Sequence, residues 1–93
     1  MRLLSVAVIF ALFLMPLSAQ KQISDDTIID QVRVHLAGDT EVGGRPIDVE
    51  AKQGVVTLKG RVRNEKQRSK AEKIAKKVKG VSSVVNQLVI TQE

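Results

Sequence analysis

Residues 47–62 read IDVEAKQGVVTLKGRV, and this stretch predicts a β-hairpin. Apolar and polar residues alternate on both sides of Gln53-Gly54, as they do in strands that bury one face. Gln53-Gly54 forms the two-residue turn, with glycine where a positive φ is favoured. In the register that this turn sets, Asp48 meets Lys59 on one face of the hairpin. Apolar residues meet one another on the other face, which is therefore the one expected to be buried.

One helix is expected on each side of the hairpin. Ser24 or Asp25 caps the first helix, whose apolar residues follow at helical spacing, and Gly38 ends it. Asn64 caps the second helix, and Gly80 is expected to stop it. The expected structural turn and cap positions are Ser24, Gly54, Gly60 and Gly80.

Residues 84–91 predict a third strand, with Leu88 and Ile90 pointing inward. The order of elements is therefore α-β-β-α-β, which is an α+β fold. The third strand follows the second helix, so it should lie parallel to the second strand through a right-handed crossover. Two helices then pack on one face of a three-stranded mixed sheet.

The N-terminal segment predicts export. A short basic start precedes residues 3–15, which are almost wholly apolar, and a small residue stands at a plausible cleavage point, Ala19. The apolar run is shorter than the ~20 residues that a bilayer core requires. We expect a secretory signal over residues 1–19, a flexible leader over 20–23 and a folded domain over 24–91. An uncleaved anchor is the alternative, and either form is periplasmic or otherwise exported, with a peripheral membrane position open to it.

Residues 20–93 contain no Phe, Tyr, Trp, Met or Cys. The exported chain would therefore have no Phe, Tyr or Trp ring to stack on a base or a sugar, no disulfide and no thiolate ligand. The whole chain carries a net charge of +5, and a mildly basic exported domain favours anionic surfaces such as lipid headgroups. Nucleic acid is the natural alternative for such a domain. Export, the missing aromatic residues and the lack of a GxxG clamp argue against it.

Three motifs account for most of the expected domain. They are Ser24-Asp25-Asp26-x-Ile28; Ile47-x-Val49 with Gly54-Val55-Val56-Thr57-Leu58-x-Gly60-x-Val62; and Ala71-x-x-Ile74-Ala75-x-x-Val78-x-Gly80-Val81-x-x-Val84-x-Asn86-x-Leu88. From about Ser24 to Thr91 the chain resembles a BON domain, a bacterial module named for an osmotically induced periplasmic protein and nodulation proteins. The resemblance implies a non-enzymatic envelope module that binds phospholipid and helps to maintain the membrane under osmotic stress. Family members often carry tandem copies, whereas this chain has one, so a function that needs two copies would require self-association.

The second helix carries the main candidate binding surface. Its apolar residues form the buried face, and five lysines without an acidic residue fall on the opposite arc. Two arginines at the end of the second strand add to this charge. The predicted anionic-lipid-binding residues are Lys66, Lys70, Lys73, Lys76, Lys77, Arg61 and Arg63. Each lysine contributes at most ~1 kcal/mol near an anionic bilayer, so binding should be weak, and an ordinary solvated face is the alternative.

No catalytic, metal or cofactor site is expected. His35 is the only histidine and falls at the edge of the first helix's apolar stripe, where it should be partly exposed. Asp26 and Asp30 share one helix face, but nothing predicts a burial that would separate their pKa values. His35, Asp39 and Glu41 lack a recognised metal-ligand spacing.

Protein interaction or self-assembly is the alternative function. The sheet face away from the helices is expected to be uncovered, and the last strand to leave an edge open. Val34 lies off the first helix's apolar stripe, on the same side as Ile23 and Thr27, which indicates a second apolar contact. The partner would be an envelope protein or, in a homo-oligomer, a second copy of the chain.

Overall fold

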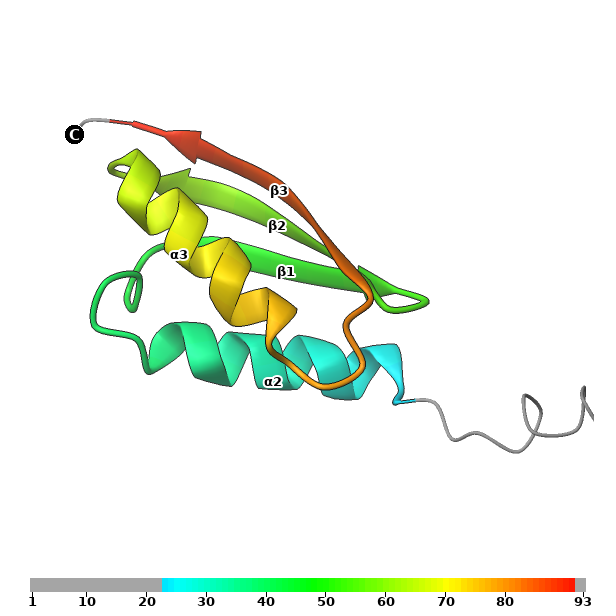
Figure 1. Ribbon diagram of the computed structural model, residues 1–93. Helices are drawn as coiled ribbons and strands as arrows, with labels where there is room; N and C mark the ends of the chain where they lie inside the picture. The colour runs from blue at the N-terminus through cyan, green and yellow to red at the C-terminus, as the bar shows by residue number, and fades with distance from the viewer. Residues whose placement is uncertain (1–22, 92–93) are drawn as a thin grey trace, which may run out of the picture.

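The structure is a computed structural model that describes residues 23–91 (Figure 1). Its elements in chain order are α2 (Asp25–Ala37), β1 (Ile47–Lys52), β2 (Val55–Val62), α3 (Glu65–Lys76) and β3 (Ser83–Ile90). This α-β-β-α-β order confirms the predicted α+β fold. The predicted signal over residues 1–19 and residues 20–22 of the predicted leader lie outside the described residues.

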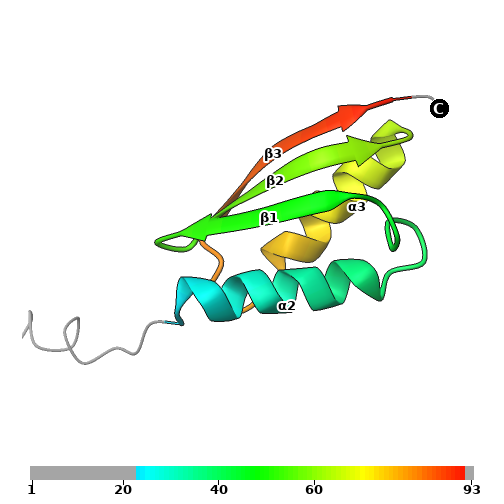
Figure 2. The ribbon, with the colours of Figure 1, turned by 180° about the vertical axis from the view of Figure 1, so that it is seen from behind.

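The three strands form one mixed sheet in the order β1-β2-β3, which leaves β1 and β3 at its two edges. β1 and β2 run antiparallel, with Lys52 opposite Val55 and Asp48 opposite Lys59, which is the register predicted from the turn. β2 and β3 run parallel. Figure 1 and Figure 2 show both helices on one face of the sheet, as predicted. α2 contacts β1, α3 contacts β3 and β2, and the two helices contact each other.

The hairpin turn is held by the start of α2. Gln53 and Gly54 both have a positive φ, 51° and 84°, as a type I′ turn requires. The carboxylate of Asp25 accepts hydrogen bonds from the backbone N–H groups of both residues, at 3.2 Å and 3.5 Å. The N–H of Ser82 donates to the carbonyl of Gly54 at 2.8 Å, so the segment before β3 is joined to the same turn.

Gly60 lies inside β2 opposite Ile47, so it is a strand residue and not one of the turn or cap positions with which it was grouped. Its φ is +139°, and a Cβ at this position would collide with the carbonyl oxygen of Pro46. Glycine is therefore needed here because β1 and β2 approach closely, and not because the chain reverses.

The capping side chains explain where both helices begin. Ser24 Oγ accepts a hydrogen bond from the N–H of Thr27 at 3.2 Å at the start of α2. Asn64 Oδ1 accepts one from the N–H of Gln67 at 2.8 Å at the start of α3. α2 ends as expected, with Gly38 as its C-cap.

α3 ends earlier than predicted. Its last residue is Lys76, so the prediction that Gly80 stops the helix is wrong. The N–H of Val78 donates to the carbonyl of Ala75 in a tight turn after the helix, and Val78 is 7% exposed. Gly80, with φ +98°, follows in the next turn, where a Cβ would lie 3.0 Å from the Cβ of Ile23. The early end thus lets the chain insert Val78 into the core.

The core consists of aliphatic side chains from all five elements. Val42, in the loop between α2 and β1, is 1% exposed and therefore belongs to the core. Leu88 is buried as predicted, but Ile90 is 41% exposed because it ends a strand at the edge of the sheet. Ile23 packs against the core and so does not belong to a flexible leader.

Candidate functional site

All five predicted lysines of the second helix are exposed on or directly after α3. Three of them are paired with carboxylates. Lys66 Nζ lies 3.7 Å from Glu41, Lys70 Nζ lies 3.6 Å from Asp39, and Lys76 Nζ lies 3.1 Å from Glu72. The arc on α3 itself holds no acidic residue, but carboxylates beside it neutralise three of its five lysines. A helical projection of α3 could not include Asp39 and Glu41, which reach it from the loop after α2.

Asp39 organises that loop. Its Oδ1 accepts hydrogen bonds from the N–H groups of Glu41 at 2.7 Å and Val42 at 3.2 Å. The Glu41 hydrogen bond is the main cause that holds the pKa of Asp39 below its ordinary value, with further contributions from the Val42 N–H and Lys70. The loop is thus closed by an ionised carboxylate, which positions Val42 in the core and neutralises Lys70.

Glu72 has a similar role on the other side of α3. Its Oε1 accepts a hydrogen bond from Asn86 Nδ2 at 3.1 Å, and its Oε2 pairs with Lys76. The Asn86 hydrogen bond, followed by the one from Lys76, lowers the pKa of Glu72. The charge of Lys76 is therefore balanced by a carboxylate that is itself anchored to β3.

Lys73 and Lys77 differ from the other three. Within residues 23–91, no carboxylate lies within salt-bridge distance of either side chain. They are four residues apart along α3 and its C-cap, so they project from the same side of the helix. Of the predicted lysines, these two can meet an external anion without breaking an ion pair.

The two predicted arginines do not join this pair as one surface. Arg61 is opposite Val89 in the sheet, on the face away from the helices, because its neighbours Gly60 and Val62 face the core side. Arg63 is exposed just after β2, and its N–H donates to Gln67 Oε1 at 2.7 Å at the start of α3. The lysines and Arg61 therefore lie on opposite faces of the molecule.

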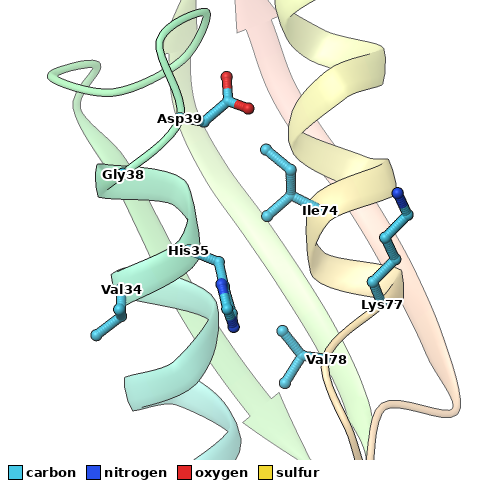
Figure 3. Close-up of a pocket in the computed structure, with 7 residues that line it drawn as sticks. All are labelled: Val34, His35, Gly38, Asp39, Ile74, Lys77 and Val78. Carbon is cyan, nitrogen blue, oxygen red and sulfur yellow. The ribbon is translucent and has the colours of Figure 1, made fainter.

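A shallow groove of about 560 Å³ runs between α2 and α3 beside Lys77 (Figure 3). It is lined by Val34, His35, Gly38, Asp39, Ile74, Lys77 and Val78. Figure 3 shows His35, Ile74 and Val78 pointing into the space between the helices, with Val34 and Lys77 at its two outer margins. Val34 is 61% exposed. The off-stripe position of Val34 predicted a second apolar contact on α2, and the groove is the apolar surface that borders it.

Other kinds of site have no support in the part of the chain that the structure describes. Residues 23–91 contain no cluster of three His, Cys, Asp or Glu side chains that could hold a metal ion. Over the same residues, no helix has the length and apolar character needed to cross a membrane. His35, Asp39 and Glu41 belong to the groove and the loop described above.

Comparison with known proteins identifies the fold. Residues 24–92 match the BON domain family. The chain is also 41% identical over 64 residues to osmotically-inducible protein Y of Escherichia coli (strain K12), a match that covers 69% of this chain and 32% of that protein. The chain thus spans about a third of the length of this relative. Because the family match covers nearly all the described residues and their α-β-β-α-β order, the chain belongs to the BON domain family.

Proposed function

We propose that this BON domain is a non-enzymatic module of the bacterial envelope that binds weakly to anionic phospholipid surfaces and supports envelope integrity under osmotic stress. The similarity to an osmotically-inducible protein supports the link to osmotic stress. The signal predicted over residues 1–19 supports a periplasmic or otherwise exported location. The family is not known to be catalytic, which agrees with the lack of a predicted catalytic site.

The observation that carries the proposal is the pair Lys73 and Lys77. Both are exposed, neither has a carboxylate partner within residues 23–91, and Lys77 borders an apolar groove. A lipid phosphate can therefore approach them without displacing an existing ion pair. Lys66, Lys70 and Lys76 would have to exchange their carboxylates for phosphates and so contribute less.

The expected affinity is low. Each lysine near an anionic bilayer contributes ~1 kcal/mol, so the two unpaired lysines supply about 2 kcal/mol and all five about 5 kcal/mol. Even the larger figure corresponds to a dissociation constant of only roughly 0.2 mM. One domain would therefore sample the membrane surface reversibly, and salt would release it.

Liposome flotation tests the proposal. The protein is produced from the full chain, purified in the form that the cell delivers, and mixed with vesicles of anionic or zwitterionic phospholipid. We expect it to float with the anionic vesicles at low salt, to float less as salt rises, and to stay at the bottom with zwitterionic vesicles. A failure to float with anionic vesicles at low salt would overturn the proposal.

Protein interaction without lipid contact is the second candidate function. It is favoured by three exposed apolar side chains of β3 that take no part in the proposed lipid contact of Lys73 and Lys77. They are Val85, Val89 and Ile90. Binding to nucleic acid is not proposed, because the exported chain would have no Phe, Tyr or Trp side chain to stack on a base.

A further inference from the structure

β3 is an edge strand without the charges that usually protect an edge. Its sequence, SVVNQLVI, contains no charged residue and no proline, whereas β1 at the other edge carries Asp48, Glu50 and Lys52. Among residues 23–91, Figure 1 shows no helix or strand beyond β3 on its outer side. Val85 and Val89 are 41% and 57% exposed on the face away from the helices. This edge is therefore open to pairing with another strand.

The hydrogen-bonding groups at this edge can be assigned from the ladder. The N–H of Thr91, directly after β3, donates to the carbonyl of Val62 in β2 at 2.8 Å. Backbone groups alternate between the two sides of a strand, so the odd-numbered residues of β3 face β2. The groups that face the open edge belong to Val84, Asn86, Leu88 and Ile90.

The middle of the edge is shielded by side chains of the domain itself. Asn86 Oδ1 accepts a hydrogen bond from the N–H of Leu88 at 3.2 Å, and Arg68 Nε donates to the carbonyl of Leu88 at 3.4 Å. Both distances are at the long end of the hydrogen-bond range, so backbone bonds from an added strand can replace them.

We propose that β3 pairs antiparallel with β3 of a second copy, with the two-fold axis at Gln87. Val85 of one copy then lies opposite Val89 of the other, and Val84 lies opposite Ile90. Every exposed apolar side chain of β3 thereby gains an apolar partner, and the two sheets become one of six strands. A two-fold axis at Asn86 would instead place Val85 opposite Gln87 and Val89 opposite Ser83, so the apolar pattern selects the first register.

The charges beside the strand agree with this register. In the single copy Arg68 reaches the carbonyl of Leu88, a contact that it gives up when the strands pair, and Glu72 accepts a hydrogen bond from Asn86. Because the proposed register pairs Leu88 with Asn86 of the other copy, Arg68 of each copy comes beside Glu72 of the other. Opposite charges therefore come near each other twice across the axis, although each is already paired within its own copy, Arg68 with Glu65 and Glu72 with Lys76. The only side chain on the axis is the neutral Gln87.

Charge substitution at the axis tests the proposal. Gln87 is exposed, so Gln87→Lys and Gln87→Glu should fold normally, but each places two like charges against each other in a dimer. Gln31→Lys, on the exposed surface of α2, is the matched control. Each protein is expressed from the full-length sequence and purified after any processing by the cell. Its molecular mass is then measured without lipid by sedimentation equilibrium, at concentrations up to its solubility limit.

We expect a concentration-dependent dimer for the wild type and the control, and a monomer for Gln87→Lys and for Gln87→Glu alone. An equal mixture of the two variants should regain the dimer, because opposite charges then meet at the axis. A wild type that stays monomeric throughout, or single variants that dimerise as well as the wild type, would overturn the proposal. The outcome does not depend on lipid binding.

Discussion

The carboxylate of Asp39 lies 3.6 Å from the ammonium group of Lys70 and joins the loop after α2 to the middle of α3. Together with the Glu41–Lys66 pair, this contact neutralises the two lysines nearest the N-terminal end of α3, Lys66 and Lys70. The positive charge that remains available is therefore shifted toward the C-terminal end of α3, where Lys73 and Lys77 lie. This relationship determines which substitutions should affect stability and which should affect membrane binding.

Asp39→Asn keeps a side-chain oxygen for the loop but removes the charge. We expect a lower free energy of unfolding at neutral pH than in the wild type. The folded-state pKa of Asp39 lies below its ordinary value of 3.8, so its stabilising effect is complete above that pH and is lost as the pH falls through the folded pKa. The difference between variant and wild type should therefore shrink below pH 3.8. Urea unfolding from neutral pH to below pH 3.8 measures this difference in stability, with Asp30→Asn as an exposed control on α2.

A difference that persists unchanged into acid would show that the charge of Asp39 does not stabilise the loop. An equal pH dependence for Asp30→Asn would have the same consequence, since that carboxylate is on the exposed surface of α2.

Gly60→Ala should destabilise the domain more than Gly44→Ala. Both glycines have a positive φ, but a Cβ at Gly44 meets nothing within 4 Å, whereas one at Gly60 collides with Pro46. Holding an alanine at a positive φ costs about 1–2 kcal/mol by itself, which is the loss of unfolding free energy expected for Gly44→Ala. The collision should raise the loss at Gly60 to about 3 kcal/mol or more. Thermal or urea unfolding measures both, and equal losses would contradict the close approach of β1 and β2.

Asn86→Ala should weaken the attachment of β3 to α3. Asn86 Nδ2 donates to the carbonyl of Arg68 at 2.9 Å and to Glu72, so its removal should cost about 1–3 kcal/mol. The pKa of Glu72 should also rise toward its ordinary value of 4.5, since Asn86 is the main cause of its lowering. NMR titration of Glu72 measures this shift, with Gln87→Ala as a neighbouring control. An unchanged pKa in Asn86→Ala would contradict the assigned contact.

Lys70→Gln and Lys73→Gln should have different effects. Lys70→Gln removes the ion pair with Asp39 and should lower the free energy of unfolding slightly, by up to about 1 kcal/mol, because the pair is partly exposed. Lys73→Gln should leave stability unchanged but reduce flotation with anionic vesicles more than Lys70→Gln does. Urea unfolding and liposome flotation of both variants test this. A larger loss of flotation in Lys70→Gln than in Lys73→Gln would mean that paired lysines bind lipid better than unpaired ones.

The fold was predictable from sequence because its signals are local. The Gln53-Gly54 turn and the alternation around it predict the hairpin register, and the capping residues Ser24 and Asn64 predict where the helices start. The end of α3 was not predictable in this way. Lys77 continues the lysine pattern, but the need to insert Val78 into the core ends the helix at Lys76.

The candidate site was only partly predictable. Exposure of the lysines follows from the helical period, since they lie opposite the buried Ala71 and Ala75. The pairing of Lys66 and Lys70 does not, because it depends on tertiary contacts with the loop after α2, far earlier in the chain. The Lys76–Glu72 pair joins residues four apart on α3, so the helical period could have predicted it. The separation of Arg61 from the lysines follows from strand alternation, which places it on the outer face. Alternation could have been applied to Arg61 in advance.

The central claim is that the unpaired end of α3 meets the anionic membrane. It is tested most directly by flotation of Lys73→Glu/Lys77→Glu with anionic vesicles at low salt. The matched control is Lys52→Glu/Lys59→Glu, which makes the same change in net charge on the sheet face away from the helices. We predict that the first variant stays unbound while the control floats more than the first variant does. Equal loss in both variants would mean that only net charge matters, and undiminished flotation of the first would place the contact elsewhere; either result would contradict the account.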